Sequence, residues 1–123
     1  MTEPTFILLY VANPEASGAF YAGLLGRAPA EASPGFVMFA FDNGLKLGLW
    51  KRDTVAPAAA GAGGGGEVAI AVADRAGVDR MHSGWAARGT EILQAPVAMD
   101  FGYTFTAADP DGHRIRVFAP GAA

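Results

Sequence analysis

The chain has 123 residues, of which 51% are hydrophobic and 17% charged, so it is long and apolar enough to fold as one domain with a sizeable core. Its net charge of −3 lacks the basic excess of a general nucleic-acid binder, and the absence of cysteine excludes disulfides and thiolate chemistry. We expect a soluble, cytoplasmic protein with no membrane contact. No apolar run approaches the ~20 residues that span a bilayer, and the N-terminus does not resemble a signal peptide.

The first half of the chain predicts a β-α-β-β-β module. An apolar run over residues 6–11, bounded by turn residues, is typical of a buried strand. Asn13, Pro14 and Glu15 predict a helix start, because they supply a cap, a first-turn proline and an acid near the positive end of the dipole; Gly26 ends that helix. Further strands are predicted within 27–33, at 36–41 and at 45–50, the last two around the turn at 42–44.

Residues 51–66 predict a flexible linker, because they combine Pro57, several alanines and four consecutive glycines. The glycines do not predict a phosphate loop, since a strand follows them rather than a helix with a Lys-Ser/Thr pair.

The second half repeats the first. A strand at 67–72 leads to Asp74, a helix cap, and to a helix at 75–88; a short strand at 91–93 and strands at 102–107 and 113–118 follow. Val11-Ala12-Asn13 aligns with Val72-Ala73-Asp74. The sequence therefore predicts an α+β fold in a single domain, 1–123, built from modules 4–50 and 67–119.

Strand alternation sorts the side chains of both modules into two faces. Aliphatic positions such as Leu47, Leu49, Ile115 and Val117 are expected to pack under the helices, which leaves the helices on the outer faces of the curved mixed sheets. The opposite faces suggest a ligand cleft, because they mix aromatic, small and charged residues. Those positions are Phe6, Gly48, Trp50, Glu67, Arg116 and Phe118. Residues 36–41 are apolar on both faces and cannot be assigned.

Paired modules that end in Asp109-Pro110-Asp111-Gly112 followed by residues 113–118 resemble the glyoxalase/bleomycin-resistance/extradiol-dioxygenase superfamily, also called the vicinal oxygen chelate fold. The resemblance implies a cleft between the modules and commonly a homodimer. It also implies four metal-ligand positions, which fall on Phe6, Gly48, Glu67 and Arg116. Only Glu67 can donate to a metal, and Arg116 places a permanent cation there, so we expect no metal and no other cofactor.

Members of this superfamily without the metal include resistance proteins that sequester an antibiotic. Trp50, the segment 99–102 and the Arg-Val-Phe ending are similar to the phenazine-resistance group. We therefore expect a binding protein for a flat aromatic ligand, with no catalytic residue, in which Trp50 and Phe118 supply the aromatic walls. The predicted ligand-binding residues are Trp50, Phe118, Arg116, Glu67, Gly48, Phe6, Tyr103, Phe101 and Asp100.

Several alternatives remain open at this point. Arg116 can form a structural ion pair with Glu67 or bind a carboxylate on the ligand. Tyr103 and Phe101 fit core packing equally well, and Asp100 fits a turn cap. The competing function is a metal-dependent lyase, isomerase or dioxygenase with unusual ligands such as Glu67, Asp100 and His113, and a third is an interaction module with a vestigial cleft.

Overall fold

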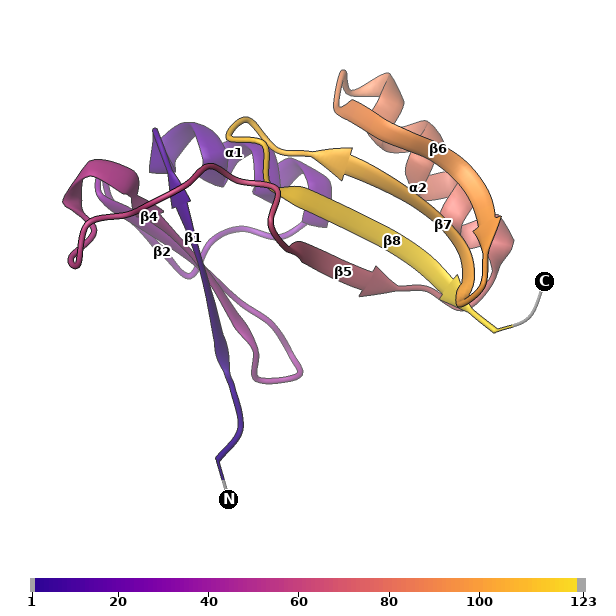
Figure 1. The fold of residues 1–123 in the computed structure, drawn as a ribbon, viewed down its shortest axis with the longest axis horizontal. Coiled ribbons are helices and arrows are strands. Elements are labelled where there is room, and N and C mark those ends of the chain that lie inside the picture. Colours follow the sequence, from indigo (N-terminus) through magenta and orange to yellow (C-terminus); the bar gives the residue numbers. More distant parts are fainter. Residues whose placement is uncertain (1, 122–123) are drawn as a thin grey trace. The chain divides into compact units, whose positions relative to one another are not determined.

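The structure is a computed structural model that describes residues 2–121. It contains two compact units, the first ending at Gly61 and the second beginning at Ala62, and the division falls within the predicted linker. Each unit has a four-stranded mixed sheet with one helix packed against one face, as Figure 1 shows for each unit in turn. The α+β class and the repeated β-α-β-β-β order are thus confirmed.

The first unit has the strand order β1-β4-β3-β2, in which β1 and β4 are parallel and the other neighbours antiparallel. The short 3-10 helix η1 occupies the start of the predicted linker. The elements are β1 (Phe6–Val11), α1 (Pro14–Leu25), β2 (Glu31–Ala32), β3 (Phe36–Ala40), β4 (Lys46–Lys51) and η1 (Arg52–Thr54).

Helix α1 begins and ends as the sequence predicts. The Asn13 side chain accepts a hydrogen bond from the Ala16 N–H at 3.1 Å, and Gly26 ends the helix at φ 64°. The helix lies close to the sheet, because a Cβ added at Gly18 would stand 3.0 Å from the Val37 side chain. The core between them holds the aliphatic face of the strands together with Tyr21, Phe39 and Val37, which assigns the strand whose faces the sequence left open.

The second unit repeats this arrangement with the strand order β5-β8-β7-β6. Asp74 caps α2 by accepting from the Gly77 N–H at 2.8 Å. Trp85 is buried with its ring centroid 5.2 Å from that of Phe105, so it belongs to the core as expected. The elements are β5 (Glu67–Ala71), α2 (Arg75–Ala87), β6 (Glu91–Met99), β7 (Gly102–Ala108) and β8 (Arg114–Pro120).

Strand β6 corrects the prediction of a short strand at 91–93, because it continues to Met99 and includes Pro96. A proline removes a ladder donor and argues against a central strand, but β6 is at the edge of its sheet, where that donor is not needed. The pairing with β7 shifts register on both sides of Gln94. Within residues 2–121, no helix is long and apolar enough to cross a membrane.

Candidate functional site

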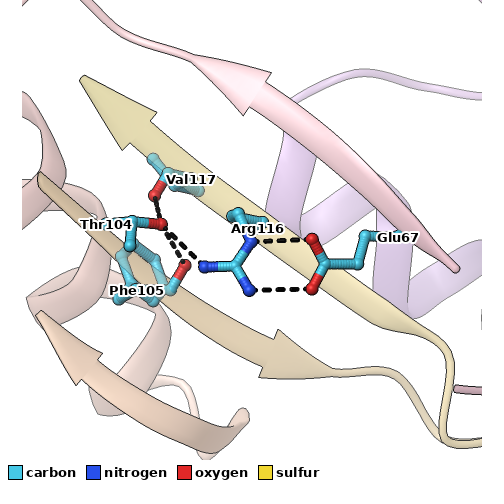
Figure 2. A network of polar contacts seen from close by, with 5 residues as sticks. All are labelled: Glu67, Thr104, Phe105, Arg116 and Val117. Carbon is cyan, nitrogen blue, oxygen red and sulfur yellow. Dashed lines mark hydrogen bonds and ion pairs between the residues drawn. The ribbon is translucent and has the colours of Figure 1, made fainter. Parts of the chain in front are cut away.

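An ion pair lies on the sheet of the second unit, on the face opposite α2. Arg116 on β8 donates from Nε to Glu67 Oε1 at 2.7 Å and from Nη2 to Glu67 Oε2 at 2.8 Å (Figure 2). Two parallel bonds of this kind are the strong, geometrically specific form of an Arg–carboxylate contact. Of the two roles that the sequence left open for Arg116, the structure shows the pairing with Glu67.

The pair extends into the neighbouring strand through Thr104. Arg116 Nη1 donates to Thr104 Oγ1 at 3.2 Å, and the Thr104 hydroxyl donates to the Val117 carbonyl at 2.8 Å (Figure 2). The network therefore links β5, β8 and β7. The hydrogen bonds from Arg116 lower the pKa of Glu67 against the opposing effect of burial, and the carboxylate in turn raises the pKa of Arg116.

Two aromatic rings stand beside this network. Phe101, in the turn between β6 and β7, lies with its ring centroid 5.7 Å from Arg116 Cζ, within the range of a cation–π contact. The ring of Phe118 meets Phe101 edge to face at 6.1 Å. Phe101 is 45% exposed, so this aromatic surface is accessible from solvent. Four predicted residues, Glu67, Phe101, Arg116 and Phe118, are thus together.

Tyr103 and Asp100 are not part of that group. The hairpin register puts Tyr103 on the opposite face of the sheet, where its hydroxyl donates to Asp79 Oδ1 at 2.8 Å and Arg75 lies over its ring. The hydrogen bond to this carboxylate raises the pKa of Tyr103. Asp100 is exposed in the turn before β7. We leave both residues out of the candidate site.

The other three predicted residues gather on the first unit, on the sheet face opposite α1. Gly48 lies beneath the side chains of Phe6, Leu8 and Phe36, since an added Cβ would come within 2.9 Å of all three. Trp50 is half-buried and meets Tyr10 edge to face at 6.1 Å. This face is apolar and partly exposed, with Phe6 41% accessible.

The four positions where the resemblance implies metal ligands do not fit a divalent metal. Phe6 and Gly48 have no donor side chain, and both oxygens of Glu67 accept hydrogen bonds from Arg116. A metal at Glu67 would have to displace this cation and share the carboxylate with a like charge. No cluster of three or more His, Asp or Glu side chains suited to a metal occurs within the described part of the chain.

A separate hollow in the first unit lies beside η1, and none of the predicted site residues lines it. It is lined by Ala12, Arg52, Asp53, Val55, Ala58 and Ala59. Its lining carries no buried charged group and no cluster of aromatic side chains.

Two residues that the sequence did not predict for the site, Thr104 and Thr106, share the face of Arg116. Their register partners are Phe118 and Arg116, respectively. Strand alternation separates these positions into two sets. The first is Gly102, Thr104 and Thr106, and the second is Tyr103, Phe105 and Ala107. Only the register of the hairpin shows which set shares the face of Arg116.

In each of the two repeated modules, one edge strand pairs in parallel with its neighbour, and the other strand pairs are antiparallel. This repeated topology defines the vicinal oxygen chelate type of α+β fold. The model of the Glyoxalase/Bleomycin resistance protein/Dioxygenase superfamily matches residues 4–117. The chain belongs to this superfamily.

Individual relatives agree with this assignment. The chain is 29% identical over 119 residues to the phenazine antibiotic resistance protein EhpR of Enterobacter agglomerans, a match that covers 93% of this chain and 89% of EhpR. It is 56% identical to an Agrobacterium tumefaciens protein solved by solution NMR, with a TM-score of 0.90 and 99% and 100% of the two chains covered. A glyoxalase/bleomycin resistance protein/dioxygenase from Nocardioides is 26% identical, with a TM-score of 0.81 and coverage of 98% and 84%.

Proposed function

We propose that this protein binds and sequesters a flat aromatic small molecule of the phenazine class, without a metal, as a cytoplasmic homodimer that confers drug resistance. The observation that carries the proposal is the accessible Phe101–Phe118 pair beside the Arg116–Glu67 ion pair. The relative EhpR, a phenazine antibiotic resistance protein, supports the choice of ligand class.

The exposed aromatic surface of the second unit suits a flat ring system. Exposed aromatic rings offer large rigid surfaces on which a planar ligand stacks at low cost in conformational entropy. The first unit offers a second aromatic surface at Trp50 and Tyr10, which we also assign to ligand binding.

We propose binding without a metal because of the residues at the four implied metal-ligand positions. Glu67 is the one potential ligand among the four implied positions, and its carboxylate is committed to Arg116 through two hydrogen bonds. Sequestration needs no further reactive group, because tight non-covalent binding lowers the free concentration of the antibiotic by mass action.

The test is a titration of the freshly purified protein with phenazine. Calorimetry measures the binding, and native mass spectrometry measures the mass of the protein and of anything bound to it. We expect saturable binding at micromolar concentration, a dimer mass, no stoichiometric metal and recovery of unaltered phenazine. Failure of phenazine and of a panel of other planar aromatics to bind would contradict the proposal. A stoichiometric metal would instead favour the metal-dependent enzyme.

A further inference from the structure

Thr106 carries a buried hydroxyl without a partner. The residue is 2% exposed, and its Oγ1 has no hydrogen-bonding partner among residues 2–121. Its neighbour Thr104, on the same face of β7, both accepts from Arg116 and donates to Val117. Because an unsatisfied buried hydroxyl is destabilising, such a group in a native fold calls for an explanation.

The position of Thr106 relates it to the candidate site. Its register partners are Arg116 on β8 and Gln94 on β6, so it lies in the same row as the guanidinium of the ion pair. That guanidinium has five N–H hydrogens, and its three hydrogen bonds to Glu67 and Thr104 use three of them. The Thr106 hydroxyl and the two remaining N–H hydrogens of Arg116 therefore lie on the same face. Within residues 2–121, none of these donors has an acceptor.

We propose that Thr106, together with Arg116, binds a hydrogen-bond acceptor on the edge of the flat ligand, such as a ring nitrogen. This inference rests on the proposed function, and it adds that the ligand is a heteroaromatic rather than a plain hydrocarbon. Because Thr106 Oγ1 is covered, the proposal requires a neighbouring side chain to move, and we assign that movement to its exposed register partner Gln94.

A hydrogen bond between Thr106 and the ligand's acceptor explains how the site would discriminate between ligands. A ligand without an acceptor leaves the buried hydroxyl unsatisfied, whereas one with an acceptor satisfies it. Sites built from buried polar groups reject analogues that lack the matching atom more strongly than apolar sites reject a change in size.

The test compares phenazine with anthracene, which has the same three-ring shape but no ring nitrogens. Affinities are measured for the full-length wild type, for Thr106→Val, which keeps the shape of the side chain, and for Thr106→Ser, which keeps the hydroxyl. We expect the wild type and Thr106→Ser to prefer phenazine by about three- to tenfold, and Thr106→Val to lose this preference with its affinity for anthracene unchanged. Thr5→Val, at an exposed position before β1, is the matched control and should keep the preference.

Stability gives a second readout that needs no ligand. Thr106→Val should raise the midpoint of thermal unfolding, because it removes an unsatisfied buried group. A lowered midpoint would mean that the hydroxyl has a partner within the protein and would overturn the inference. Equal affinities for the two ligands in all variants would also overturn it but leave the proposed function intact. Failure of phenazine, of anthracene and of the panel of other planar aromatics to bind the wild type would overturn the two together.

Discussion

Arg116 holds both carboxylate oxygens of Glu67 across the parallel strands β8 and β5, at 2.7 and 2.8 Å. The two residues are 49 positions apart in the chain, so the pair fastens the first strand of the second module to its last. Arg116 and Glu67 also coincide with two positions that the resemblance assigns to metal ligands. The ion pair therefore occupies the two of the four implied metal-ligand positions that belong to the second unit.

Replacing Glu67 with Gln should destabilise the second unit. The substitution preserves shape but removes the charge that compensates Arg116, whose side chain is 17% exposed. Because both groups keep some contact with water, we expect a loss of about 1 kcal/mol rather than the larger value of a fully buried pair. Urea unfolding at neutral pH measures this difference.

Glu3→Gln is the matched control for that experiment. Glu3 is exposed and precedes the first strand, so its substitution should leave the unfolding midpoint unchanged. Equal stability of Glu67→Gln and wild type would show that the ion pair contributes nothing measurable.

The stabilising effect of the pair should disappear in acid. Arg116 lowers the pKa of Glu67 below its usual value of 4.5, so the folded protein holds the carboxylate ionised more firmly than the unfolded chain does. The contribution is present in full above the unfolded pKa and is lost as pH falls through the folded one. The stability gap between wild type and Glu67→Gln should therefore narrow steadily below about pH 4.5. A gap that stays constant from pH 7 to pH 3 would exclude this linkage.

Local signals in the sequence predicted most of the fold. Asn13, Asp74 and Gly26 marked helix ends because capping chemistry depends on few neighbouring residues. Strand β6 was underestimated because an edge strand tolerates Pro96, and only the sheet order reveals which strand is at the edge.

The candidate site was predicted less completely than the fold. Alternation placed Glu67, Arg116 and Phe118 on one face, and the structure brings them together. Tyr103 was assigned to the site from its closeness to a turn, whereas the register of β7 with β8 puts it under α2. A shift of one residue moves a side chain to the other face, so positions next to a turn need that register.

Gly102 should be among the least replaceable residues of the second unit. Its φ of 147° is unfavourable for other residues, and an added Cβ would stand 2.1 Å from the Ala119 carbonyl oxygen. We expect Gly102→Ala to cost about 3 kcal/mol or more, because backbone rather than a flexible side chain blocks the new atom.

The substitution Gly84→Ala, in the same unit, should have the opposite effect on stability. Gly84 lies inside α2 and an added Cβ meets nothing within 4 Å, so alanine should stabilise the protein by about 0.5–1 kcal/mol through its higher helix propensity. Thermal unfolding of the two variants beside the wild type measures both effects. Similar midpoints for the two variants would contradict the clash inferred at Gly102.

Trp50 tests whether the aromatic face of the first unit takes part in binding. Its indole meets Tyr10 edge to face and keeps part of its surface exposed, as a stacking surface requires. Trp50→Ala should weaken phenazine binding by about 1–3 kcal/mol, the usual cost of truncating an aromatic anchor, while Trp50→Phe should retain most of the affinity. Calorimetry is the suitable measurement, because the substitution removes a fluorescent reporter, and circular dichroism checks that the alanine variant is folded. Unchanged affinity in a folded Trp50→Ala variant would confine the binding surface to the second unit, where Phe101, Phe118 and Arg116 would have to account for it alone.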